Sequence, residues 1–385
     1  MTTLVGGPGG AQGEGSPVRR RFGVPDLPDF PWDTLAAARA TAAGHPDGIV
    51  DLSVGTPVDA TPETIRVALA AAADAPGYPT TTGPESLRRA IADYLVRSAR
   101  SLPLSTHQVL PTIGSKELVA TLPWQLGLGP GDTIVLPELA YPTYAVGAQL
   151  AGCRMVASDR PQDLDDPSIA LVWVNSPSNP SGRIASAAEL AELVAWARAH
   201  DVLLVSDECY LPFAFTAPAT SVLSPEVNNG SLDHLLAVHS LSKRSNLAGY
   251  RAGFVAGDQT AVEALLAVRK QSGFLVPTPV QVAMAAAVDD DRHVEEQKAR
   301  YAARRDVLAP ALREAGFTLD HSEGALYLWC TRGDDSAATV AWLAARGILV
   351  APGTFYGAAG ARHVRVAVTA TDERIDAAAR RLHHS

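Results

Sequence analysis

The sequence contains few cysteines and no long apolar run. Its three cysteines, Cys153, Cys209 and Cys330, are scattered and show no CxxC spacing. A sparse, odd set argues against a disulfide framework and against a zinc site, and it is typical of reduced thiols in a cytosolic protein. No stretch approaches the length needed to cross a bilayer, and the N-terminus lacks the apolar segment of a signal peptide. We therefore expect a cytoplasmic protein with no membrane segment and no metal site.

Positive charge is also scarce. Lys and Arg number 32 against 41 Asp and Glu, which gives a formal net charge of -9. Nucleic-acid binding is disfavoured, because a phosphate backbone requires a basic face. A site for an anionic small molecule must therefore be a local exception to the overall charge. The Gly-rich residues 1–22 are predicted to be a disordered leader, and Arg19, Arg20 and Arg21 within it a solvated basic patch.

The length of 385 residues favours two domains. Between about residues 85 and 275, short β-type runs alternate with helical stretches such as 187–200, which indicates an α/β domain with a mostly parallel sheet. The predicted strands are 133–136, 169–174, 202–206, 235–238 and 253–256. We expect this large domain to cover residues 55–275.

The C-terminal part predicts a smaller α+β unit. Its expected helices are 294–315, 336–346 and a last one from Asp372, and its expected strands are 325–330, 348–351 and 364–368. The segment 33–43 near the N-terminus is helical by pattern and is expected to pack with this unit. The small domain is therefore predicted to combine residues 23–54 and 276–385.

Polar residues follow three of the predicted strands directly. Asn179-Pro180-Ser181-Gly182 lies beyond 169–174, Asp207-Glu208-Cys209-Tyr210 beyond 202–206, and Ser240-Leu241-Ser242-Lys243 beyond 235–238. In open α/β sheets, ligands bind beyond the carboxyl ends of the strands. These three loops are therefore predicted to converge on one site.

The residue types in these loops meet the requirements of a pyridine aldehyde cofactor. Lys243 supplies an amine that can form an imine with the aldehyde. Asp207 is placed to keep the ring nitrogen protonated, and Asn179 and Tyr210 can donate to the ring oxygen. Ser240, Ser242 and Arg251 offer hydroxyls and an arginine for a phosphate, and Gly114-Ser115-Lys116 opens a helical run whose N-terminus can bind it.

At these residues the sequence resembles the fold-type I family of pyridoxal-phosphate enzymes, and within it the class I aminotransferases. The matching motifs are Ser240-x-Ser242-Lys243 with Arg251 and Gly253, Asn179-Pro180-Ser181-Gly182, Asp207-x-x-Tyr210, Tyr141-Pro142-x-Tyr144, and Tyr78 with Gly83 and Leu87-Arg88. They occur in the order of the family and extend over nearly everything after the leader. The resemblance implies a mostly parallel seven-stranded sheet in the large domain, with the small α+β domain beside it.

The resemblance also implies a role for each site residue. Lys243 would bind pyridoxal 5'-phosphate covalently and shuttle the α-proton, with Asp207 and Tyr210 as further catalytic residues. The cofactor-binding set would be Gly114, Ser115, Lys116 through its backbone N–H, Tyr141, Asn179, Asp207, Tyr210, Ser240, Ser242, Lys243, Arg251 and, from a neighbouring subunit, Tyr78. Gly55, Asn179 and Arg365 would bind the substrate, with Arg365 on its α-carboxylate. The active form would be a homodimer with shared active sites, acting on amino acids and 2-oxo acids.

Simpler interpretations exist for several of these residues. Asp207 could cap a helix that follows it, and Asn179-Pro180-Ser181-Gly182 could be a turn. Tyr144 and Cys209 are expected to be core residues. The core motifs also fit a β-elimination, as in a C–S lyase, because transamination and elimination share their first steps. A ligand-sensing regulator on the same fold is a weaker possibility, since the short N-terminal segment offers no DNA-binding module.

A closer likeness narrows the substrate. Segments 27–35, 51–58, 137–144 and 206–211 look like the actinobacterial succinyldiaminopimelate aminotransferases. This resemblance implies transfer between glutamate/2-oxoglutarate and N-succinyl-2-amino-6-oxopimelate, toward diaminopimelate and lysine, with an aspartate- or aromatic-type specificity as the alternative. Lys270 and the segment 274–278 are candidates for binding the succinyl end. Arg244 departs from the usual small or polar residue, and the sequence leaves open whether it points to solvent or inward.

Overall fold

A computed structural model describes residues 27–383 of the chain. The predicted leader and its three arginines lie outside these residues. Within the described part, no helix is both long and apolar enough to cross a membrane.

The centre of the molecule is a seven-stranded sheet with the order β2-β8-β7-β6-β5-β3-β4. Its strands are β2 (Val109–Ile113), β3 (Thr133–Leu136), β4 (Arg154–Ala157), β5 (Ile169–Asn175), β6 (Leu203–Asp207), β7 (Leu235–Ser240) and β8 (Ala252–Gly257). β8 runs antiparallel to both of its neighbours, and all other neighbouring pairs are parallel. The predicted α/β class with a mostly parallel sheet is confirmed.

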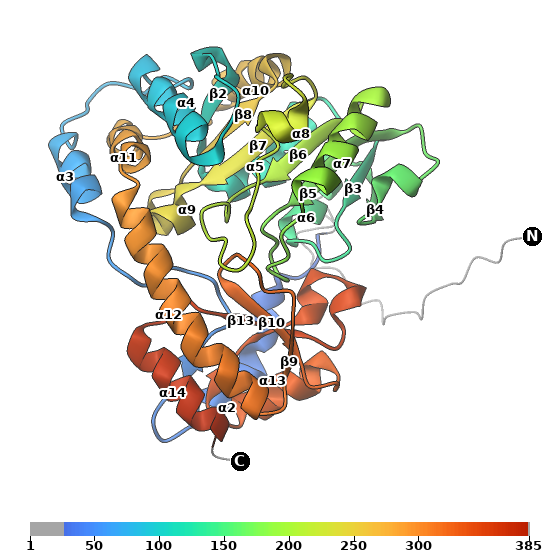
Figure 1. Cartoon of the computed structure of the whole chain (residues 1–385). Helices are drawn as coiled ribbons and strands as arrows, with labels where there is room; N and C mark the ends of the chain where they lie inside the picture. Colours follow the sequence, from blue (N-terminus) through green and yellow to red (C-terminus); the bar gives the residue numbers. More distant parts are fainter. Residues whose placement is uncertain (1–26, 384–385) are drawn as a thin grey trace, which may run out of the picture.

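Helices cover both faces of this sheet (Figure 1). The strands are apolar on both sides, and alternate residues enter different cores: Leu171 and Trp173 pack on one face, and Val172 packs on the other. The first face carries α5 (Gly114–Gln125), α6 (Thr143–Ala151) and α10 (Gln259–Ser272). The second carries α3 (Glu63–Ala71), α4 (Glu85–Ala99), α7 (Ala187–Ala199), the short α8 (Pro225–Asn228) and α11 (Thr278–Asp289).

A second, smaller unit is built from both ends of the described chain. Its antiparallel sheet has the order β12-β13-β10-β9, with β9 (Thr318–Asp320), β10 (Tyr327–Thr331), β12 (Ala351–Pro352) and β13 (Val364–Ala367). A separate parallel pair joins β1 (Val50–Asp51) to β11 (Ile348–Leu349). Helices α2 (Ala36–Ala43), α12 (Arg292–Glu314), α13 (Ser336–Ala344) and α14 (Asp372–His383) complete it, and α12 runs from this unit up to α11 of the large unit (Figure 1). The N-terminal helix packs on α13, as predicted.

The structure differs from the predicted elements at several places. The segment 348–351 is not one strand, because β11 pairs with β1 whereas β12 pairs with β13. The strand predicted from 325 begins at Tyr327, since Ala325 has a φ of 58° that no strand accommodates. β2 was not predicted because Pro111 interrupts its pattern, yet β2 is an edge strand, where a proline is tolerated. β4, also unpredicted, is the opposite edge and is largely exposed.

Candidate active site

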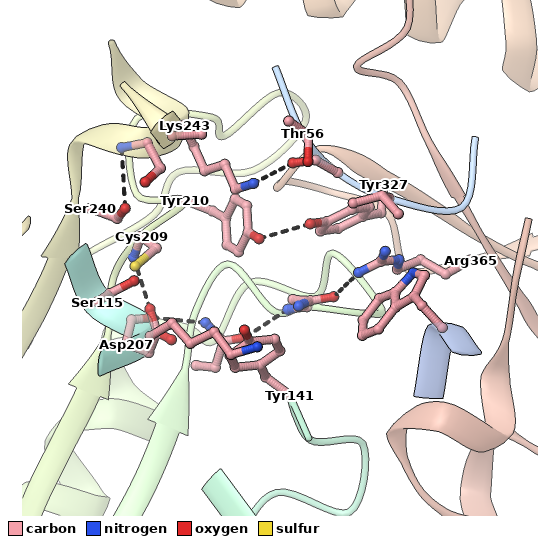
Figure 2. A pocket seen from close by; sticks show the side chains of 18 of the residues that line it. Thr56, Ser115, Tyr141, Asp207, Cys209, Tyr210, Ser240, Lys243, Tyr327 and Arg365 are labelled. Carbon is pink, nitrogen blue, oxygen red and sulfur yellow. Dashed lines mark hydrogen bonds between the residues drawn. The ribbon is translucent and has the colours of Figure 1, made fainter. Parts of the chain in front are cut away.

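A cavity of about 520 Å³ lies where the small unit meets the carboxyl ends of β5, β6 and β7. All of the predicted site residues except Gly114 and Tyr78 line it. They are Gly55, Ser115, Lys116, Tyr141, Asn179, Asp207, Tyr210, Ser240, Ser242, Lys243, Arg251 and Arg365. The predicted convergence of the three polar loops therefore occurs, and Figure 2 shows their side chains around the shared space.

Lys243 sits on a short helix, α9 (Leu241–Arg244), that directly follows β7. The Ser240 hydroxyl caps this helix by accepting a hydrogen bond of 3.2 Å from the N–H of Ser242, which fixes where the lysine emerges. The Lys243 ammonium donates to the carbonyl of Gly55 from the small unit. Burial is the main cause that lowers the pKa of Lys243 below its ordinary value. A neutral, nucleophilic amine is thereby favoured at this position.

Asp207 ends β6 and is buried, with 6% of its surface exposed. Its carboxylate accepts hydrogen bonds from the hydroxyl of Tyr144 at 2.8 Å and from the N–H of Cys209 at 3.1 Å. Burial raises the pKa of Asp207, so the charged form would gain from a cation placed against it. No helix follows Asp207, and therefore it is not a helix cap. Its contact with Cys209 closes a local turn.

Arg365 is a buried cation held only by neutral groups among the described residues. Its guanidinium donates to the side-chain oxygen of Asn179 and to the carbonyl of Ser53, both at 2.7 Å. It lies 4.0 Å from the ring centre of Tyr327, and its Nε has no partner within residues 27–383. An arginine that is 2% exposed and lacks a carboxylate in the described chain is prepared for an anionic ligand.

Tyr210 and Tyr327 form a second polar contact across the cavity. Their hydroxyls are 2.8 Å apart, and their rings meet edge to face with centres 5.6 Å apart. Burial raises the pKa of Tyr210, so its hydroxyl stays protonated and can donate. Gly55 permits this arrangement, because a Cβ at Gly55 would clash with the ring and hydroxyl of Tyr327.

The start of α5 forms a cradle with Arg251. Gly114 has a φ of 72°, and a Cβ there would clash with the guanidinium of Arg251, so glycine allows the arginine to lie across the helix start. Arg251 is held in place by a hydrogen bond of 2.8 Å to the carbonyl of Ala248. Ser115 and the N–H groups of the first turn lie at the same point, where a helix binds anions. Gly114 therefore shapes the cavity without lining it.

Several predicted residues lie away from this cavity within the chain. The Tyr78 side chain is 99% exposed in the segment between α3 and α4. Lys270 is an exposed residue of α10, and neither it nor the segment 274–278 lines the cavity. Arg244 points inward: it is buried, pairs with Asp291 at 2.7 Å and lies over the ring of Tyr94. It does not line the cavity.

Some residues in or beside the cavity were not predicted to bind cofactor or substrate. Tyr144 is in the core as expected, and its ring stacks on that of Trp173 with the ring centres 4.7 Å apart. Its hydroxyl also donates a hydrogen bond to Asp207. Tyr327, Phe30, Trp32 and Arg39 come from the small unit, and no local pattern marks them. Cys209 is buried as expected and also lines the cavity.

Comparison with known proteins agrees with this geometry. The family "Aminotransferase class I and II" matches residues 47–382. A probable aminotransferase of Mycobacterium tuberculosis, Rv1178, is 56% identical over 97% of this chain and 92% of its own length. The 4-dedimethylamino-4-oxo-anhydrotetracycline transaminase OxyQ of Streptomyces rimosus is 56% identical over 93% of this chain and 99% of its own.

Solved structures give the same result. A probable N-succinyldiaminopimelate aminotransferase of Thermus thermophilus matches with a TM-score of 0.83 and 27% identity, over 92% of this chain and 99% of its own. The family uses pyridoxal phosphate as its cofactor. The chain belongs to the class I and II aminotransferases, and it is a pyridoxal-phosphate enzyme.

Proposed function

We propose that this aminotransferase is a succinyldiaminopimelate transaminase, which exchanges an amino group between glutamate and N-succinyl-2-amino-6-oxopimelate. The observation that carries the proposal is the distribution of cations around one cavity. Arg365 is buried at its inner wall, and Arg39 and Lys116 line it separately. A substrate with two widely separated carboxylates would bind Arg365 with one of them and Arg39 or Lys116 with the other.

The donor set of the cavity fits pyridoxal phosphate. Asp207 is a buried carboxylate with a raised pKa. A pyridinium N–H placed against it would lower that pKa again. The cradle of Ser115, Arg251 and the α5 N-terminus would hold the phosphate, with Ser240 and Ser242 beside it. Asn179 and Tyr210 would donate to the ring oxygen, Tyr141 would pack on the ring, and Lys243 would bind the aldehyde. When bound, the cofactor withdraws electrons from the α-carbon of the amino acid.

The residues of the chain would then handle the proton and the substrate. Lys243 would take the α-proton on Nζ, and burial lowers the pKa of this amine, which favours its neutral, proton-accepting form. Arg365 would bind the α-carboxylate through two N–H groups, and Asn179 at 2.7 Å would hold the guanidinium in place. Gly55 would keep the space beside Tyr327 open for the substrate.

The remote carboxylate of the succinyl group requires a further cation. Arg39 of α2 is 49% exposed, and within residues 27–383 it makes one ion pair, at 2.8 Å to Asp51, which leaves further N–H groups for a ligand. The Lys116 ammonium lies 5.1 Å from the ring centre of Phe30. The name of the Thermus neighbour supports this substrate, whereas the name of OxyQ points to an oxo-anhydrotetracycline. Because OxyQ is as similar to this chain as any other relative described above, its substrate is the second candidate.

A substrate panel tests the proposal. Glutamate alone should convert the lysine-bound cofactor to its amino form, seen as loss of visible absorbance, without release of ammonia. Steady ammonia release would instead indicate elimination. The N-succinyl keto acid should then give the highest kcat/KM of the panel. The other substrates are free diaminopimelate, aspartate and a tetracycline-type compound. A better value for any of the others rejects the proposed specificity.

We further propose that the enzyme acts in the cytoplasm as a homodimer with shared active sites. An almost fully exposed tyrosine, Tyr78, favours a second chain that covers it and receives it at its own phosphate cradle. The three cysteines are free and buried, which suits a reducing compartment.

A further inference from the structure

A second cavity lies in the small unit and shares no residue with the active site. Its volume is about 490 Å³, and it is formed by the loop after α2, the turn after α13 and one side of α14. These elements lie at the end of the molecule away from the seven-stranded sheet (Figure 1). Its charged residues are His45, Asp47, Arg346, Glu373, Arg374, Arg380 and Arg381. We refer to it as the arginine pocket.

The arginine pocket carries an excess of positive charge. Four arginines face two acids, Asp47 and Glu373, and the carboxylate of Asp47 is 83% exposed. None of the four arginines has an ion pair within residues 27–383, although many other arginines of this chain are paired. Burial is the main cause that lowers the pKa of Arg381; Asp47 raises it, and Arg374 and Arg380 lower it. The two neighbouring arginines therefore act against the attraction of Asp47.

Part of this cluster has a structural role. Arg381 is 8% exposed and donates to the carbonyls of Gly347 at 2.9 Å and Asp47 at 3.1 Å. Gly347, with a φ of 71°, allows this close approach, since a Cβ there would contact the guanidinium. Arg381 thus ties α14 to both loops and forms the floor of the arginine pocket.

The remaining arginines have unused donors. Arg380 is exposed and makes no hydrogen bond to any described residue. Arg346 stacks 3.6 Å from the ring centre of Trp342, and its Nε has no partner within the described chain. Arg346 also donates to the carbonyl of Trp342 at 3.2 Å, and Arg374 makes two long contacts of 3.5 Å to backbone carbonyls. Carbonyls of the described residues therefore occupy part of Arg346 and Arg374, and each guanidinium keeps further N–H donors for a ligand.

We propose that the arginine pocket binds a small phosphorylated anion with two or more negative charges. Guanidinium groups match phosphoryl oxygens in planar, two-pronged hydrogen bonds, and several around one hollow favour a compact polyanion. The volume suits a small-molecule ligand. The loop after α2 that lines the arginine pocket continues into β1. Beyond β1, the carbonyl of Ser53 accepts a hydrogen bond from Arg365. An anion that ties this loop to α14 would stabilise the small unit on which the substrate side of the active site depends.

Pyrophosphate is the probe, titrated into the holoenzyme by calorimetry at constant ionic strength, with the cofactor already filling its own phosphate site. We expect saturable binding of one pyrophosphate per chain, a rise in Tm that saturates with it, and no change in the cofactor spectrum. Citrate, a carboxylate of similar charge, is the comparison, and we expect it to bind more weakly than pyrophosphate. Equal binding of citrate would overturn the phosphoryl assignment, and no saturable binding of pyrophosphate would overturn the site.

Matched variants separate the pocket from general electrostatics. Arg380→Gln and Arg313→Gln each remove one exposed arginine from the last turn of a small-unit helix, but only Arg380 belongs to the pocket. We expect Arg380→Gln and Arg374→Gln each to weaken binding about tenfold, and Arg313→Gln to change it less than about twofold. Equal losses in all three variants would contradict a defined site.

Discussion

The hydroxyl of Tyr144 donates a hydrogen bond of 2.8 Å to Asp207, although the two residues lie 63 positions apart. Both are buried, and burial raises the pKa of each. The tyrosine therefore stays protonated as a donor and partly offsets the cost of a buried carboxylate charge. Tyr144 is a positioning residue for the group that is proposed to face the cofactor ring.

Replacing Tyr144 by Phe should weaken this electrostatic support. The pKa of Asp207 would rise further, and its pairing with the ring nitrogen would weaken. A hydrogen bond to a charged group contributes about 1.5–3 kcal/mol, so we expect kcat to fall at least about tenfold and cofactor affinity to decrease. Tyr301→Phe is the control, because Tyr301 is buried outside the cavity. Unchanged kcat and cofactor affinity in Tyr144→Phe would refute the role.

The lowered pKa of Lys243 predicts the pH dependence of cofactor capture. Only the neutral amine attacks the aldehyde, and burial moves its pKa below the ordinary 10.5. The capture rate of the apoenzyme should therefore rise with pH, reach half its maximum below 10.5 and stay level at higher pH. Stopped-flow absorbance measures this rate, with a free lysine derivative as the reference. A midpoint equal to that of the reference would contradict the prediction.

Gly55→Ala should damage the site through one methyl group. The new Cβ would clash with Tyr327, whose hydroxyl pairs with Tyr210. We expect kcat/KM to fall at least about tenfold and the free energy of unfolding to decrease by about 1–3 kcal/mol, as for overpacked cores. Gly77→Ala is the matched control, since nothing lies within 4 Å of a Cβ there. Wild-type activity in Gly55→Ala would show that this space is not needed.

Arg39→Gln tests the binding of the remote carboxylate. If Arg39 binds the succinyl group, kcat/KM for the N-succinyl keto acid should drop about tenfold. The half-reaction with glutamate should change less than twofold, because Arg365 would remain intact. Arg89→Gln, which breaks a surface pair with Glu85 on α4, should affect neither. Equal losses for both substrates would rule out selective recognition by Arg39.

Shared active sites predict complementation between two inactive variants. Lys243→Ala removes the proposed covalent anchor, and Tyr78→Ala removes the residue proposed to enter the partner's site. Co-refolding them in equal amounts should place one intact site in each mixed dimer and restore about a quarter of wild-type activity. Activity no greater than the mean of the two separate variants would exclude a site built by two chains.

The sequence predicted the residues that are proposed to bind the cofactor better than those that are proposed to bind the substrate. Ser240, Ser242, Lys243 and Arg251 lie within one connection, and Asn179 and Asp207 follow strands whose ends meet at one sheet edge. By contrast, Arg39 and Tyr327 enter the cavity only because the small unit docks there, and no local pattern encodes that docking. The burial of Tyr144 was predictable from its type, but its bond to Asp207 depends on how α6 packs on the sheet.

The antiparallel direction of β8 has a consequence for the order of assembly. Because β7 and β8 are antiparallel neighbours joined by the eleven residues 241–251, Lys243 and Arg251 come together after closing one short loop. Arg365 meets the carbonyl of Ser53 only after 312 residues of chain have been brought together. Local contacts form earlier than distant ones. A folding chain should therefore gain its cofactor-capturing elements before it can distinguish one substrate from another.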